Sequence, residues 1–272
     1  MASHCGWWQL IQPAGILAWG KPSFLSLAND CLRESRDPQR KNACMSRSIA
    51  LFIALACWTL FAGPVIAQDQ HQHRRPNNIS QYLEQLDSSE RDQYQKPIQV
   101  IEALNLKPGQ AVADLGSGSG YFTRRLVAAV TESGKVYAID VEPEMLRYVE
   151  ESLVHTHAPY SAEFILARSD SPKLPAESVN LIFVCNVFHH LEDRTTYFRN
   201  ARSALKAGGR IAIIDFYHDE RSGDLGFPKQ HLVPREAVIA EMTEAGYRLE
   251  REHNFLPRQY FLEFIPPLPP TR

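Results

Sequence analysis

Residues 112–121 read VADLGSGSGY: a short apolar strand, a turn with three glycines and the beginning of a helix. Glycines let a ligand approach the backbone closely, and the first N–H groups of a helix favour negative charge. In open α/β sheets, ligands bind where a strand ends and such a turn begins. We therefore expect a ligand site at the carboxyl end of this strand.

Apolar strands and amphipathic helices alternate on both sides of this stretch. Buried, β-branched strands that alternate with helices predict a doubly wound, Rossmann-like α/β sheet of mostly parallel strands. Residues 247–265 contain two strand-like runs around a short turn, which we expect to add an antiparallel edge. The expected strands are 111–115, 135–140, 163–168, 179–188 and 210–216, and the expected helices are 79–105, 121–130, 143–154, 193–205 and 234–245.

The spacing of the glycines separates two classes of nucleotide site. Dinucleotide sites use G-x-G-x-x-G, whereas this turn has D-x-G-x-G-x-G, with Asp114 two residues before Gly116. A carboxylate at that point suits a ligand with an ammonium group better than a pyrophosphate. Asp140 ends the next strand about 20 residues after Gly120, where an acidic residue binds a ribose. The spacing therefore disfavours a nicotinamide-dependent oxidoreductase.

Residues 95–250 resemble the class I S-adenosylmethionine-dependent methyltransferases, in particular their small-molecule branch. The resemblance rests on five motifs in order: VADLGSGSG, VYAIDVEPEML, ARSDSPKLPAESVNLIF, VCNVFHHLED and LKAGGRIAIIDF. It departs from the family at Asn180, where the fourth strand often carries an acid. The resemblance implies a seven-stranded sheet with the last strand antiparallel, S-adenosylmethionine as cofactor, and direct methyl transfer that depends mainly on alignment of donor and acceptor.

The same resemblance assigns a set of cofactor-binding residues. Asp140 would bind the ribose, Asp170 would lie near the adenine amine, and Asn186 would contact the methionine portion or the acceptor. The full set is Asp114, Gly116, Ser117, Gly118, Gly120, Asp140, Asp170 and Asn186.

Two histidines are the candidates for acid–base catalysis. His189 and His190 follow the fourth strand, and histidine titrates near neutral pH. The alternative is that the pair packs against or caps the helix that begins near Asp193. The next candidates for a base are Tyr217 and His218. Three further expectations concern Tyr94 and Lys96, which would cover the cofactor, and Cys185, which would be a small core residue.

The first quarter of the chain differs in character from the rest. Residues 49–66 are almost continuously apolar, and Met45 and Arg47 precede them like the start of a secretory signal peptide. We expect 1–67 to be a leader, cleaved as a signal peptide or retained as a membrane anchor. Residues 68–78 form a polar linker, and 79–272 the methyltransferase-like domain. The expected location is exported, periplasmic or otherwise extracytoplasmic, or membrane-anchored; the alternative is cytoplasmic.

The composition limits the classes of partner that we expect for this chain. Of the 272 residues, 44% are hydrophobic, and the net charge is −2, so the chain has no basic surplus for nucleic acid. Cys185 is the one cysteine after residue 67, and no metal site is expected. We expect a small-molecule acceptor. Because no base is unambiguous in the sequence, the alternative function is a non-catalytic module that binds S-adenosylmethionine or S-adenosylhomocysteine.

Overall fold

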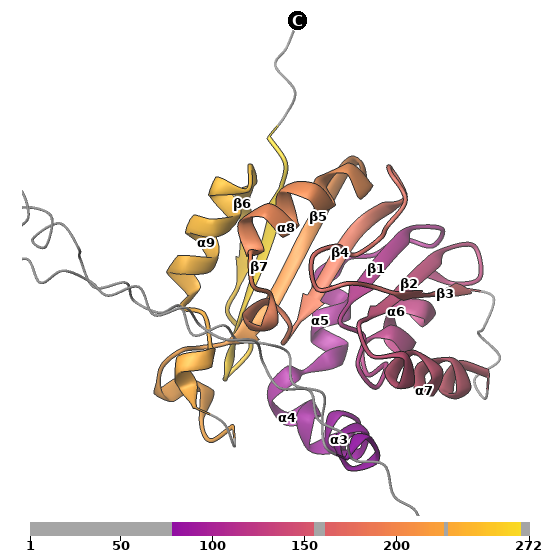
Figure 1. Ribbon diagram of the computed structural model, residues 1–272, viewed down its shortest axis with the longest axis horizontal. Coiled ribbons are helices and arrows are strands. Elements are labelled where there is room, and N and C mark those ends of the chain that lie inside the picture. Colours follow the sequence, from indigo (N-terminus) through magenta and orange to yellow (C-terminus); the bar gives the residue numbers. More distant parts are fainter. Residues whose placement is uncertain (1–77, 155–160, 226–227, 268–272) are drawn as a thin grey trace, which may run out of the picture. The chain divides into compact units, whose positions relative to one another are not determined.

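The structure, a computed structural model, describes residues 78–154, 161–225 and 228–267. These form one seven-stranded sheet in the order β3-β2-β1-β4-β5-β7-β6 (Figure 1). The predicted leader, 1–67, and all but the last residue of the linker, 68–78, lie outside the described residues.

Five strands of the sheet are parallel and the last two form a hairpin. β7 runs antiparallel to β5 on one side and to β6 on the other. This confirms the predicted mostly parallel sheet with an antiparallel edge, and the antiparallel strand itself lies one place inside that edge. The strands are β1 Ala111–Leu115, β2 Lys135–Asp140, β3 Ala162–Leu166, β4 Val179–Cys185, β5 Leu205–Phe216, β6 Arg248–His253 and β7 Gln259–Ile265.

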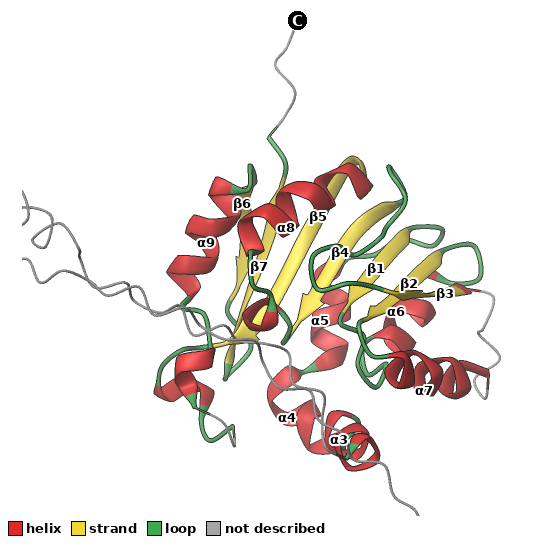
Figure 2. Ribbon diagram, viewed as in Figure 1, coloured by secondary structure: helices red, strands yellow, loops and turns green. Residues whose placement is uncertain are grey.

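Helices cover both faces of the sheet, as Figure 2 shows. Helices α8 and α9 pack on one face, and α5, α6 and α7 pack on the other. Helices α3 and α4 lie beyond the carboxyl ends of the parallel strands (Figure 1). The helices are α3 Ile79–Leu86, α4 Asp92–Gln95, α5 Pro97–Leu104, α6 Thr123–Val130, α7 Pro143–Val154, α8 Arg194–Ala201 and α9 Arg235–Glu244.

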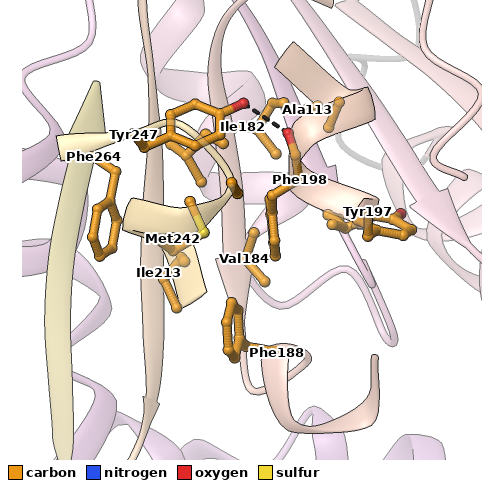
Figure 3. Close-up of a cluster of buried hydrophobic side chains, with 14 of the residues drawn as sticks. Ala113, Ile182, Val184, Phe188, Tyr197, Phe198, Ile213, Met242, Tyr247 and Phe264 are labelled. Atoms are coloured by element: carbon orange, nitrogen blue, oxygen red, sulfur yellow. Dashed lines mark hydrogen bonds between the residues drawn. The ribbon is translucent and has the colours of Figure 1, made fainter. Parts of the chain in front are cut away.

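Each face of the sheet has its own hydrophobic core. On the α8–α9 face, Phe198 and Met242 pack against strand residues such as Ile213 (Figure 3). The hydroxyl of Tyr247 donates a hydrogen bond of 2.9 Å to the carbonyl of Phe198, so this buried polar group is satisfied. Two separate cores hold the strands from both sides and fix the edge at which they end.

The predicted helix 79–105 is instead several short helices, which is a correction with two local causes. Ser88 caps a short 3₁₀ turn by accepting a hydrogen bond from the backbone N–H of Glu90, 3.2 Å away. Lys96 has a φ of 41° and precedes Pro97, and a residue before proline is disfavoured in the α conformation. The breaks turn α3 and α4 over the end of the sheet.

Strand β5 begins earlier than predicted, at Leu205 rather than residue 210. Its pairing with β4 shifts between Val179 and Leu181, so residues 206–209 form a bulge that the two glycines permit. Strand β4 ends at Cys185 rather than at residue 188, because Asn186 adopts a left-handed φ of 59°. A 3₁₀ turn, Phe188–His190, follows.

Candidate functional site

A cavity of about 980 Å³ lies at the carboxyl ends of β1, β2, β4 and β5. The turns after these strands form its floor, and side chains of α3 and α4, among them Tyr82 and Tyr94, line it from the other side. This is the position at which doubly wound sheets bind ligands. Its size is at the upper end for a small-molecule site.

The glycine turn after β1 is shaped by its neighbours. The backbone N–H groups of Gly116 and Ser117 both donate to the carbonyl of Ile139, at 2.8 and 2.9 Å. Gly116 has a φ of 73°, and a Cβ there would lie 2.2 Å from Cγ2 of Val187. Gly116 and Gly118 line the cavity, whereas Gly120 packs against Val149 of α7 and does not.

Asp114 is buried at the end of β1 and lines the cavity. Burial raises the pKa of its carboxyl to about 7, the nearby Asp140 adds to the rise, and a 2.6 Å hydrogen bond from Thr123 Oγ1 opposes it. Beside it, Ser117 Oγ is buried and has no hydrogen-bond partner within the described part of the chain. Such a group is ready to pair with a ligand.

Asp140 ends β2 and lines the cavity, but Asp170 does not. The two carboxylate oxygens of Asp140 accept hydrogen bonds from the backbone N–H groups of Gly118, at 2.9 Å, and Glu142, at 3.0 Å. Asp170 is exposed and paired with Arg168 at 3.0 Å, outside the lining. The structure therefore brings Asp114, Asp140 and the glycine turn together and leaves Asp170 apart.

Two residues at the end of β4 also line the cavity. Asn186 Oδ1 accepts a hydrogen bond of 2.6 Å from Gln259, at the start of β7. Cys185, expected to be a core residue, packs against the core of the α5–α7 face and also lines the cavity, where its sulfur accepts a 3.1 Å hydrogen bond from Gln95 of α4. Burial raises the pKa of the Cys185 thiol, so the group stays protonated and unreactive.

The two candidate histidines have different environments in the structure. His189 is buried, and its Nδ1 lies 2.8 and 2.9 Å from the two carboxylate oxygens of Asp215, the fully buried penultimate residue of β5. Since a carboxylate only accepts, Nδ1 donates to it, and Nε2 is the ring nitrogen on the side away from Asp215. Asp215 is itself held by the backbone N–H groups of His189 and Phe216.

The other candidate residues divide into those inside and outside the lining. His190 is exposed but lines the cavity, with its ring centre 4.1 Å from that of His189. Tyr94 also lines it. Lys96 does not, and its ammonium donates to the carbonyl of Phe255 at 2.8 Å. The remaining two expected residues, Tyr217 and His218, lie outside the lining.

Sequence reasoning missed Asp215, Gln95 and two arginines of the lining, Arg91 and Arg258. Asp215 had a detectable signal, an acid at the end of the apolar run IAIID. No sequence signal pointed to Arg258. It comes from the loop before the last strand, β7, and it lies at the site only because β7 is next to β5 in the sheet. No group of three or more His, Cys, Asp and Glu residues in the described ranges is arranged to hold a metal ion.

Comparisons with known proteins agree with this geometry. The family model described as a methyltransferase domain matches residues 113–213. A solved S-adenosylmethionine-dependent methyltransferase from Aquifex aeolicus is 28% identical, with a TM-score of 0.64 over 70% of this chain and 98% of its own. The chain belongs to the class I S-adenosylmethionine-dependent methyltransferases. S-adenosylmethionine is accordingly its cofactor.

Curated methyltransferases are similar over a shorter range. The ubiquinone/menaquinone biosynthesis C-methyltransferase UbiE of Cronobacter sakazakii is 28% identical over 54% of this chain and 60% of its own length. The protein of the same name from Vibrio vulnificus is 24% identical over 54% and 58%. This chain thus spans about 60% of the length of these relatives.

The residues of the cavity fit this cofactor. An ammonium group suits the buried Asp114, and a ribose suits Asp140 at the end of β2. The unpartnered hydroxyl of Ser117 and the open backbone of Gly116 and Gly118 lie between these two carboxylates along the turn. The assignment of individual residues to parts of the cofactor stays a prediction.

No helix among residues 78–154, 161–225 and 228–267 is both long enough and apolar enough to cross a membrane. The apolar segment 49–66, for which a membrane tether was predicted, lies outside these residues.

Proposed function

We propose that the chain transfers a methyl group from S-adenosylmethionine to a small-molecule acceptor, with His189 receiving the acceptor's proton. The observation that carries the proposal is a single cavity that is lined both by Asp114 and Asp140 and by His189, whose ring is hydrogen-bonded to the buried Asp215 behind it. Its volume of about 980 Å³ leaves room for an acceptor beside the cofactor.

The order of the strands separates two halves of the cavity. β2 and β1 bring Asp140, Asp114 and the glycine turn, which we call the cofactor half. β4 and β5 bring His189 and Phe216, and Arg258 precedes β7; we call this the acceptor half. Because β1 and β4 are neighbours in the sheet, the two halves meet at the turn after β4.

The chemistry that we propose needs one proton acceptor. When bound, the cofactor supplies an electrophilic methyl group on a positively charged sulfur. A hydroxyl, amine or ring carbon that accepts this methyl group loses a proton, which passes to Nε2 of His189. Asp215 holds the ring through Nδ1 and stabilises the imidazolium that results. The imidazolium then returns the proton to water after the products leave.

The named function of the relatives is compatible with this base. Those proteins are named as C-methyltransferases of ubiquinone and menaquinone biosynthesis. Methylation of a ring carbon also releases a proton, so the same histidine would serve a carbon acceptor. A non-catalytic binding module is the alternative, and the oriented His189–Asp215 pair favours the enzyme, because cofactor binding alone has no use for a base.

Methyl-labelled S-adenosylmethionine tests the proposal directly. The full chain is incubated with panels of phenols, amines and quinols, and both S-adenosylhomocysteine and the labelled product are measured. We expect product formation that depends on His189 and survives replacement of His190. If S-adenosylmethionine binds but no acceptor across a broad panel or a cell extract is methylated, the binding module is the better description.

We also propose that residues 45–67 direct export or membrane attachment. The support is the basic start and the apolar run of that segment. Mass spectrometry of the protein from fractionated cells would identify its mature N-terminus. An intact Met1 in the soluble cytoplasmic fraction would contradict the proposal.

A further inference from the structure

Of the seven partly buried arginines among the described residues, five are paired with carboxylates. Arg194 pairs with Glu241 at 2.5 Å and Arg210 with Glu263 at 2.6 Å, for example. The same holds for Arg124, Arg125 and Arg235. Among the described residues that are neither exposed nor fully buried, two arginines lack such a partner: Arg91 and Arg258. Both line the cavity.

Arg91 belongs to the cofactor half. Its guanidinium lies 4.1 Å from the ring centre of Tyr121, directly after the glycine turn, and donates to Gln95 Oε1 at 2.7 Å. Its charge also acts on the pKa of Asp114. Arg91 is therefore a positive charge of the cofactor half, to which S-adenosylmethionine would bring its one carboxylate.

Arg258 belongs to the acceptor half. It immediately precedes β7, and its backbone carbonyl accepts a 3.1 Å hydrogen bond from Tyr217 N. Its guanidinium lies 5.3 Å from the ring centre of Tyr94, whose ring centre is 5.8 Å from that of Phe216. No described carboxylate, including Asp224 in the same lining, forms an ion pair with Arg258. The positive charge thus stands beside an aromatic wall made of Tyr94 and Phe216.

A partly buried guanidinium loses hydrogen bonds to water. Only an anion or other hydrogen-bond acceptors can replace them. Guanidinium groups bind carboxylates through two parallel hydrogen bonds, which makes them specific for planar oxyanions. Because the cofactor has a single carboxylate and Arg91 stands in its half, we assign Arg258 to an anion of the acceptor.

We propose that the acceptor is a small planar molecule that carries a carboxylate or a similar oxyanion, bound by Arg258 with its ring against Tyr94 and Phe216. This rests on the proposed function and specifies its substrate class. The acceptor atom to be methylated would point away from Arg258, toward His189.

Binding of two matched probes tests this without knowledge of the natural acceptor. 4-Hydroxybenzoate and its neutral analogue 4-hydroxybenzamide are titrated by calorimetry into the full chain saturated with S-adenosylhomocysteine. We expect the carboxylate to bind at least tenfold more tightly than the amide. In Arg258→Gln the ratio of the two affinities should fall to about one. The control is Arg251→Gln, at an exposed arginine of β6 outside the lining, which should keep the preference of the unaltered chain.

Each result decides the inference. Equal affinities for the two probes in the unaltered chain, no binding of either, or a preference that persists in Arg258→Gln would overturn it. If Arg258→Gln does not fold, Arg258→Lys replaces it and should retain at least a threefold preference; loss of the preference in a folded Lys variant contradicts a charge-based site. Failure of the proposed function gives a different result, because S-adenosylhomocysteine would still bind while the methyl-transfer assay detects no product with any acceptor.

Discussion

The two halves of the cavity are built in different ways. In the cofactor half, Asp114, Gly116, Ser117 and Gly118 lie within residues 114–118, at the end of β1 and in the turn after it, and Asp140 ends the adjacent strand. In the acceptor half, His189, Phe216 and Arg258 come from three distant parts of the chain. The first half relies on backbone shape and local spacing, whereas the second relies on side chains that only the folded sheet brings together. The halves should therefore respond differently to substitution.

The largest effect is expected in the acceptor half, at His189. His189→Gln should lower turnover by about 10²–10⁴-fold, the usual contribution of a positioned general base. S-adenosylhomocysteine affinity should change by less than about threefold, since the residue acts on the acceptor rather than the donor. Methyl-transfer rates with the acceptor found in the panel, together with calorimetry, measure both.

The matched control is His190→Gln, because His190 lines the cavity but is exposed. It should keep most of the activity. Asp215→Asn should lower turnover and shift the His189 ring away from the Nδ1–H tautomer, which nitrogen-15 chemical shifts of the imidazole report. Equal losses in the two histidine variants would remove the distinction that we draw between them.

In the cofactor half, Gly116→Ala should be the most damaging change to the fold. The φ of 73° costs an L-residue about 1–2 kcal/mol, and the collision with Val187 adds overpacking of about 1–3 kcal/mol. We expect a loss of about 2–5 kcal/mol in the free energy of unfolding, measured with urea. Gly208→Ala has a similar φ of 74° but open space around the new methyl group. Its free energy of unfolding should therefore fall only by the cost of the backbone strain.

Asp140 tests the recognition of the ribose. Asp140→Ala should weaken S-adenosylhomocysteine binding by about 1.5–3 kcal/mol, the range for charge-assisted hydrogen bonds. Asp170→Ala should have no effect, because that residue is exposed and lies outside the cavity lining. A weaker affinity in Asp170→Ala would mean that the loop after β3 closes over the adenine when the cofactor binds.

The smallest effect is a pH dependence that arises from Asp114. With a pKa of about 7, its carboxyl is protonated in the free chain below neutral pH. A bound ammonium favours the carboxylate, so binding releases a proton and affinity should rise with pH up to about 7 and then level off. Between pH 6 and pH 8 we expect S-adenosylhomocysteine to bind up to about tenfold more tightly, a change worth about 1.4 kcal/mol. In Asp114→Asn the affinity should be independent of pH over this interval.

The difference between the halves also explains what could be predicted from the sequence. The strand–turn–helix unit of 112–121 and the acid at residue 140 are local patterns, and the structure places them in one cavity. Asp170 followed a local pattern too, but its pairing with Arg168 holds it at the surface. The predicted helix 193–205 ended early, because pairing with β4 extends β5 back to Leu205. Contacts between strands overrode local propensity there.

The sequence alone determined the alternation of strands and helices, the methyltransferase family and the residues of the glycine turn, because each depends on neighbours along the chain. Only the tertiary structure distinguished His189 from His190, because the distinction depends on Asp215, 26 positions further along the chain. It also brought Arg258 beside Tyr94, since β7 lies next to β5 in the sheet. Spacing in the sequence fixes what a turn can bind, and the order of the strands decides which distant side chains meet there.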